Sequence, residues 1–255
     1  MHTVDLNCDM GESFGRYTLG QDEDVLAYIT SANIACGFHA GDPLVMDTTV
    51  ALAKKNGVAV GAHPSFPDLQ GFGRRAMTMG RQELTALMIY QIGALKAFAE
   101  YYGTTLQHVK LHGALYNMAC CEEQPAAALV DAVQAIDSSL VLVALYGSQM
   151  YRQGEKAGLR VAGEFFADRN YSADGTLLTR SHKKALIDDE EDAVQRTLQA
   201  ILTGTIIAVD GTPLEVKADT ICLHGDSPTA LAFARRLREA LTEAGIAIKA
   251  MDSFL

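Results

Sequence analysis

Short apolar, β-branched segments alternate with longer amphipathic segments along nearly the whole chain. Predicted strands cover residues 3–9, 31–37, 57–63, 108–113, 140–146, 160–167, 219–224 and 246–251. Apolar residues at helical spacing predict helices over 22–30, 43–56, 81–102, 122–135, 148–157, 190–203 and 228–244. Strands that alternate with crossover helices form parallel sheets. About eight such units in 255 residues predict a TIM-like (β/α) barrel of seven or eight parallel strands, with a doubly wound open sheet as the alternative.

The segment 205–217 breaks this alternation. Asp210-Gly211 lies between two short apolar runs, which is typical of a hairpin with a two-residue turn. We therefore expect a small β-hairpin inserted before the strand at 219–224. No low-complexity linker divides the sequence, so residues 1–255 are expected to form a single barrel domain.

Polar and ionisable side chains close most of the predicted strands. These groups are costly inside an apolar strand, and the carboxyl ends of parallel strands meet at one face of a barrel. A shared active site is therefore predicted, although single residues could instead satisfy buried backbone or one another. The expected catalytic residues are Asp9, His63, Lys110, His112, Glu164, Asp168 and His224. The expected binding residues are Asn7, Glu12, Asn33, His39, Arg74, Arg169 and Asp226.

Strand periodicity supports this grouping. Side chains two apart share a face, so Lys110 and His112 should point into the barrel while Val109 and Leu111 point towards the outer helices. By the same rule Glu164, Phe166 and Asp168 share one face, as do Cys222, His224 and Asp226.

Two loops carry further candidates. Asp42 is explained as a helix cap, with Pro43 in the first helical position, whereas His39 has no such role and is expected to face a ligand. Arg74 and Arg75 lie in a glycine-bounded loop of an acidic chain. Each arginine is expected either to contact a carboxylate or phosphate group or to form a surface salt bridge.

Imidazole and carboxylate groups also suit zinc or a similar metal, for which Asp9, His39 and His63 are the candidates. His108 and His112 cannot share an ion, because residues four apart in a strand stand roughly 13 Å apart. The same groups can act without a metal as acid, base and electrostatic stabilisers, and we prefer that interpretation.

The composition excludes several classes of function. A formal net charge of -10 disfavours binding to nucleic acid or to an anionic membrane. Neither a membrane-spanning apolar stretch nor a signal peptide is evident, so a cytoplasmic protein is expected. All five cysteines are expected to be reduced thiols. The sequence contains neither a P-loop nor a Gly-x-Gly-x-x-Gly turn, so a nucleotide would need a different cradle.

Several motifs closely resemble the LamB/YcsF family, the A subunits of bacterial ATP-dependent 5-oxoprolinase. They are the segments 5–12, 32–42, 61–68, 166–169, 174–175 and 222–226. The family usually has proline where Leu111 and Thr179 stand. The resemblance implies a barrel related to those of glycoside hydrolases and polysaccharide deacetylases.

The resemblance also implies an activity: opening of 5-oxo-L-proline to L-glutamate while ATP becomes ADP and phosphate, together with subunits B and C. ATP, with Mg²⁺, is then a co-substrate, and the number of copies that assemble, a homo-oligomer included, is left open. Asp9, Glu164 or Asp168 would act as the base and a histidine as the acid. Lys110, with Arg74 or Arg169, would hold a carboxylate or phosphoryl oxygen.

Two other functions fit the same residues. One is a metal-dependent deacetylase or carbohydrate amidase, by analogy with the related barrels. The other is a non-catalytic, ligand-binding regulatory subunit.

Overall fold

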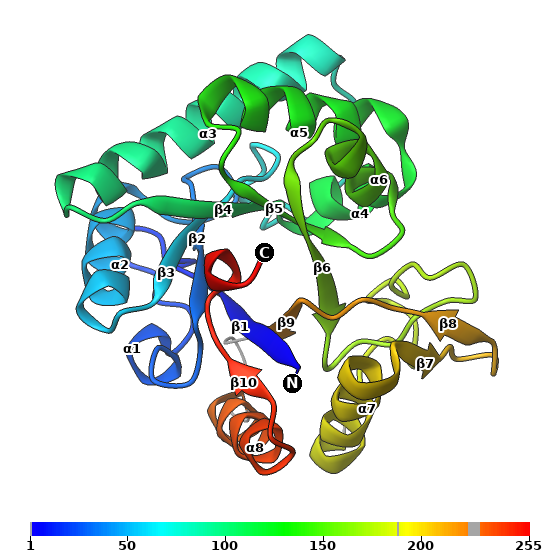
Figure 1. Ribbon diagram of the computed structural model, residues 1–255. Helices are drawn as coiled ribbons and strands as arrows, with labels where there is room; N and C mark the ends of the chain where they lie inside the picture. The colour runs from blue at the N-terminus through cyan, green and yellow to red at the C-terminus, as the bar shows by residue number, and fades with distance from the viewer. Residues whose placement is uncertain (1, 188, 224–229) are drawn as a thin grey trace.

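Seven parallel strands close into a barrel in the computed structural model, which describes residues 2–187, 189–223 and 230–255 (Figure 1). They are β1 (Thr3–Met10), β2 (Ser31–Ala35), β3 (Ala59–His63), β4 (Leu106–Lys110), β5 (Val141–Leu145), β6 (Arg160–Phe166) and β9 (Thr220–Leu223). Each strand pairs with the next along the chain, and β9 pairs with both β6 and β1, which closes the ring. The predicted barrel is confirmed, and the open sheet is excluded.

Helices surround the ring in Figure 1. They are α1 (Asp22–Val25), α2 (Pro43–Lys55), α3 (Arg81–Tyr101), α4 (Gly113–Cys121), α5 (Glu123–Ile136), α6 (Gln149–Lys156), α7 (Glu190–Thr203) and α8 (Ala230–Glu243). The predicted set omitted α4. Apolar residues lie on most sides of this short helix, so it lacks the polar face by which the others were recognised.

The predicted cap of α2 is confirmed. The Asp42 carboxylate accepts hydrogen bonds from the backbone amides of Leu44 and Val45, and Pro43 occupies the first turn. Asp189 caps α7 in the same way, since its side chain accepts a hydrogen bond from the backbone amide of Asp192.

The predicted strand over 246–251 is largely wrong. Only β10 (Ala247–Ile248) pairs, with the first residues of β1, and the chain then enters the 3-10 helix η1 (Met251–Ser253). Met251 is fully buried against Val141, Val143 and Ala162, and Figure 1 shows η1 over the middle of the ring. The C-terminal segment therefore fills the amino-terminal end of the barrel, a packing requirement that strand periodicity does not reveal.

The predicted hairpin is confirmed, but its two-residue turn is wrong. β7 (Thr205–Ile207) and β8 (Pro213–Glu215) pair antiparallel and lie outside the ring (Figure 1). The amide of Ala208 donates to the carbonyl of Thr212 at 2.8 Å, so the turn that contains Asp210-Gly211 is longer than two residues.

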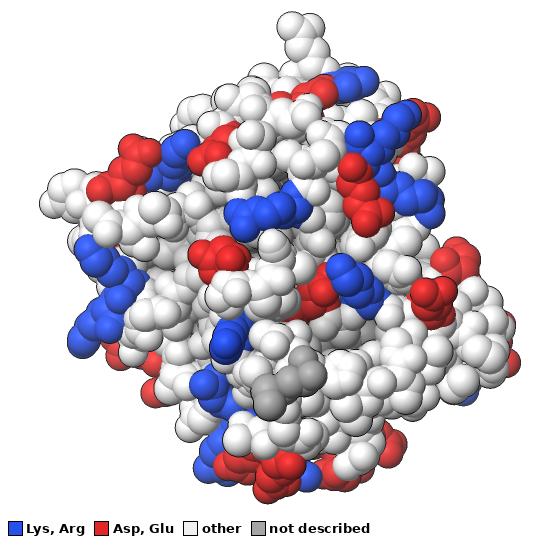
Figure 2. Space-filling view, in the orientation of Figure 1, with Lys and Arg blue, Asp and Glu red and all other residues white. Residues whose placement is uncertain are grey.

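Acidic and basic side chains are interspersed on the face shown in Figure 2, so this face offers no extended basic surface. Within the described ranges, no helix has the length and apolar character needed to cross a membrane.

Close packing of β3 against β4 generates a first prediction. A Cβ atom at Gly61 would lie 2.0 Å from Nε2 of His108, whose imidazole is fully buried and lies 2.8 Å from Oδ1 of Asn33. Gly61→Ala should therefore lower the free energy of unfolding by about 2–3 kcal/mol, because the ring cannot move away without losing that contact. Urea denaturation measures the change.

Gly93→Ala is the matched control, since a Cβ atom at this exposed position of α3 would have no neighbour within 4 Å. It should raise the unfolding free energy by about 0.5–1 kcal/mol through helix propensity. Equal stabilities of the two variants would contradict the proposed packing constraint.

Candidate active site

The ammonium group of Lys110 lies inside the barrel at the end of β4, with only 2% of the side chain exposed. Its Nζ is 2.9 Å from Oδ1 of Asp9 and 2.9 Å from Oε1 of Glu164. It also lies 3.2 Å from Oδ1 of Asn7 and 3.1 Å from Sγ of Cys222. Strands β1, β4, β6 and β9 thus converge on one cation, as the strand parity predicts.

Opposite charges keep this amine protonated. Burial alone would lower the pKa of Lys110, but attraction to the carboxylates of Asp9 and Glu164 outweighs burial and holds the pKa well above its usual value. Removing one partner from such a group would leave an uncompensated buried charge, which typically costs about 3–5 kcal/mol.

The three carboxylates predicted as possible bases occupy different places. Asp9 lines a cavity at the mouth of the barrel, and 16% of its side chain is exposed. Glu164 is completely buried behind Lys110. Asp168 follows β6, where its backbone carbonyl accepts from the amide of Ile187. Of the three, Asp9 alone is among the described residues that line the cavity.

Asn7 and Asn33, both predicted to bind ligand, lie fully buried beneath this ion pair. The amide of Asn33 donates to Oδ1 of Asn7 at 2.7 Å and to Oδ1 of Asp9 at 2.9 Å. Oδ1 of Asn33 is 2.8 Å from Nε2 of His108. In the structure these side chains satisfy one another and support Asp9.

A second polar layer lies deeper, around Asp5. Its carboxylate accepts hydrogen bonds from the hydroxyls of Ser31 at 2.6 Å, Thr30 at 2.6 Å and Thr220 at 2.5 Å. Desolvation by burial nevertheless raises the pKa of Asp5 to about 6, because it outweighs the effect of those hydrogen bonds. Sequence reasoning did not single out Asp5, although strand parity places it on the same face as Asn7 and Asp9.

Three histidines and one carboxylate meet beside Asp9. Nε2 of His39 lies 3.0 Å and Nδ1 of His112 lies 3.3 Å from Oε1 of Glu12. Nε2 of His63 lies 3.0 Å from Nδ1 of His112 and 3.3 Å from Oδ2 of Asp9. We refer to Glu12, His39, His63 and His112 as the histidine cluster. One potential ligand atom from each of the four lies within 4.8 Å of every other, so together they could hold a metal ion.

Backbone carbonyls determine the tautomers of two of these rings. Nδ1 of His63 is 2.7 Å from the carbonyl oxygen of Lys110, and Nε2 of His112 is 2.9 Å from that of Phe72. A carbonyl oxygen can only accept, so each of these nitrogens carries a proton. In the neutral rings, the nitrogens that face the cluster are then lone-pair acceptors.

Burial disfavours protonation of two of these rings, His39 and His112. Desolvation, followed by repulsion from His63, holds the pKa of His39 well below its usual value. The pKa of His112 is also well below its usual value, because of desolvation and then the proximity of His39 and His63. The rings of His39 and His112 are stacked with their centroids 3.8 Å apart, so two charged rings would repel strongly.

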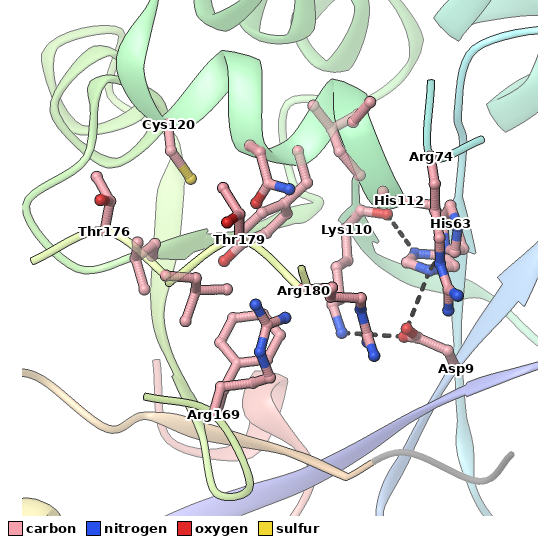
Figure 3. A pocket seen from close by; sticks show the side chains of 18 of the residues that line it. Asp9, His63, Arg74, Lys110, His112, Cys120, Arg169, Thr176, Thr179 and Arg180 are labelled. Carbon is pink, nitrogen blue, oxygen red and sulfur yellow. Dashed lines mark hydrogen bonds and ion pairs between the residues drawn. The ribbon is translucent and has the colours of Figure 1, made fainter. Parts of the chain in front are cut away.

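A cavity of about 500 Å³ opens above these groups (Figure 3). Its polar lining comes from the ends of β1, β3 and β4, from the loop before α3, from α4, and from the segment after β6. The ionisable lining residues are Asp9, Glu12, His63, Arg74, Lys110, His112, Tyr116, Cys120, Cys121, Arg169 and Arg180. His224 and Asp226, which were also predicted for this site, lie outside the described residues.

The two loop arginines have different surroundings. Arg75 forms an ion pair with Asp68, which was the salt-bridge alternative of the prediction, whereas Arg74 lines the cavity. The guanidinium of Arg169 donates to the carbonyl oxygens of Leu178 and Ala185, so it shapes the segment after β6 as well as lining the cavity.

Sequence reasoning missed several lining residues, among them Tyr116, Phe72 and Arg180. Tyr116 belongs to the overlooked helix α4. Phe72 has a φ of 54°, which is unusual for a side-chain-bearing residue, and the Cζ atom of Arg74 lies 5.0 Å from its ring centre. Arg180 reaches the cavity from a long loop, where its basic charge after a barrel strand was the only available signal.

The profile of the LamB/YcsF family matches residues 4–255. The chain belongs to this family. A curated relative, the A subunit of 5-oxoprolinase from Geobacillus kaustophilus, is 56% identical over 250 residues, which cover 98% of this chain and 97% of the relative.

Solved structures agree with the family assignment. The lactam utilization protein of Thermus thermophilus is 48% identical, with a TM-score of 0.92 over 97% of this chain and 99% of that one. A putative cellobiose-phosphate cleavage protein of Enterococcus faecalis has a TM-score of 0.60 at 14% identity, covering 99% and 98% of the two chains, and shows the fold alone.

The deep polar layer of this LamB/YcsF barrel generates a pH prediction. Because the folded-state pKa of Asp5 is raised to about 6 from its ordinary value of 3.8, its contribution to stability is fully present below the unfolded value and is lost as pH rises through about 6. On lowering pH from about 7.5 to about 4.5, the wild type should gain about 2 kcal/mol relative to Asp5→Asn.

Chemical denaturation gives the unfolding free energy of both proteins at the two pH values. The contributions of other titrating groups largely cancel when the pH-dependent change of Asp5→Asn is subtracted from that of the wild type. A difference near zero, or one of opposite sign, would show that Asp5 is not held in a desolvating environment.

Proposed function

We propose that this chain is the A subunit of an ATP-dependent 5-oxoprolinase, which hydrolyses 5-oxo-L-proline to L-glutamate with subunits B and C while ATP becomes ADP and phosphate. The proposal is supported by the name of the relative at 56% identity and by the cavity residues. The observation that carries it is the position of Asp9, a carboxylate at the cavity wall between Lys110 and His63. Because the proposed activity depends on ATP, we also propose that the protein is cytoplasmic.

Coupling to ATP compensates for the low reactivity of the lactam. A five-membered lactam is a poor electrophile, and phosphorylation of its amide oxygen makes the ring carbon attackable. In the proposed sequence, the amide oxygen accepts the γ-phosphoryl group, and water adds to the activated carbon. The C–N bond then breaks as the nitrogen gains a proton, and a second water releases phosphate. Since the chain has no familiar phosphate-binding loop, we assign phosphoryl transfer from Mg²⁺-ATP to the assembled complex.

Asp9 is the base in this scheme. It faces the cavity, and its contact with Lys110 positions the carboxylate beside a fixed positive charge. We also assign to Asp9 the return of the proton to the leaving nitrogen, instead of to a histidine. The N–H groups of His63 and His112 that are fixed by backbone carbonyls point away from the cluster.

Cations around the cavity suit an anionic substrate. Arg74 and Arg180 are exposed lining residues in a chain whose net charge is -10. We assign Arg74 to the carboxylate of 5-oxoproline and Arg180 to the phosphoryl group, because a guanidinium group can bind either one in a bidentate manner.

Asp9→Asn tests the base. In the reconstituted complex, this variant should release glutamate from 5-oxoproline and ATP roughly 100-fold more slowly or worse, which is the usual range for losing a general base. Asp131→Asn is the matched control, since Asp131 forms an exposed ion pair with Arg81 away from the cavity, and it should retain full activity.

Each protein is assayed with and without the partner subunits. Near wild-type glutamate release by the Asp9→Asn complex would overturn the proposal and favour a regulatory, ligand-binding role for this chain.

Arg74→Gln tests substrate recognition. Loss of one charge-assisted hydrogen bond should raise KM for 5-oxoproline roughly 10-fold while kcat changes little. Arg81→Gln, at an exposed pair on α3, serves as the control and should leave KM unchanged. Steady-state kinetics measure both, and a fall in kcat with unchanged KM would contradict a binding role.

A further inference from the structure

The histidine cluster contains more facing acceptor atoms than hydrogen bonds can satisfy. Nε2 of His63 and Nδ1 of His112 are 3.0 Å apart, although the opposite nitrogen of each ring is the one that donates to a backbone carbonyl. In neutral rings these two nitrogens would therefore meet lone pair to lone pair. Oxygens of Asp9 and Glu12 lie 3.3 Å from the same two atoms.

A positive charge between these atoms would remove the repulsion. One additional proton can bridge one pair of atoms, whereas three imidazoles and a carboxylate converge here. The three rings are almost fully buried, which makes more than one imidazolium unfavourable. Nδ1 of the buried His39 also has no hydrogen-bond partner among the described residues, so its ring is held by packing and by Glu12.

We propose that Glu12, His39, His63 and His112 form a binding site for one divalent cation of the zinc type. Three nitrogens and one carboxylate oxygen are the ligands that zinc and similar borderline metals prefer. Metal–ligand distances of about 2.0–2.1 Å in a tetrahedron place ligand atoms about 3.3 Å apart. The three measured distances between neighbouring ligand atoms are 3.0, 3.0 and 3.3 Å.

The surroundings also match those of a metal site. Ligating histidines usually donate their second ring nitrogen to a carbonyl or carboxylate, which orients the ring and fixes the tautomer. His63 and His112 do this with the carbonyls of Lys110 and Phe72. Glu12, His63 and His112 line the cavity, so the ion can enter from solution. The proposed metal site does not depend on the 5-oxoprolinase activity proposed above.

The test is metal binding by the full chain after dialysis against a chelator. Titration with Zn²⁺ alone by calorimetry, and with Co²⁺ followed by its visible absorption, should each give one ion per chain. His63→Gln and Glu12→Gln should weaken binding roughly 100-fold or more. His182→Gln, which makes the same change at an exposed histidine outside the cluster, should bind as the wild type does.

Circular dichroism without metal establishes that each variant is folded. If His63→Gln does not fold, Glu12→Gln decides the question, since Glu12 is partly exposed. Zn²⁺ should also raise the melting temperature of the wild type and of His182→Gln but not of Glu12→Gln. Wild-type binding no tighter than that of Glu12→Gln, or equal loss in His182→Gln, would overturn the proposal in favour of a proton shared between His63 and His112.

Discussion

A single buried cation, the ammonium group of Lys110, organises the interior of this barrel. A charge removed from water must be compensated nearby, and Asp9 and Glu164 provide that compensation from β1 and β6. Their placement depends on the closed ring, since β9 pairs with both β1 and β6 and so brings these two strands close together. The ion pair therefore links the closure of the barrel to the position of the carboxylate proposed as the base.

Polar side chains extend below this ion pair, where a TIM-like barrel would usually contain apolar layers. Asp5 and its three hydroxyl partners form the lowest layer, and Asn7 and Asn33 form the next. Because these groups hydrogen-bond to one another, they restrict the rotamers of the residues above them. The cavity is thus built on a rigid polar support, with apolar packing on the outer faces of the strands and at the plug formed by Met251.

The cavity combines two kinds of chemistry. The histidine cluster presents nitrogens and carboxylate oxygens, and Arg74, Arg169 and Arg180 present cations. Arg74 lies beside His63 and His112, whereas Arg169 lies across the cavity from them (Figure 3). Asp9 contacts both His63 and Lys110. This arrangement allows an anionic ligand to be held beside a base without placing like charges against each other.

The sequence alone determined the barrel, the face to which residues inside the strands point, and the set of polar residues near the strand ends. These features follow from local periodicity and from the cost of burying polar groups, which act on each segment separately. Beyond the last strand residue the periodicity fails: Leu111, predicted to point towards the helices, follows β4 and lines the cavity. The tertiary structure decided which residues touch. It placed Asn7 and Glu164 around the Lys110 ammonium group, and it directed Arg75 to an ion pair with Asp68 while Arg74 lines the cavity. It also ended the final strand early, and Met251 packs into the end of the barrel. Those outcomes depend on distances between segments far apart in the chain, which no local pattern encodes.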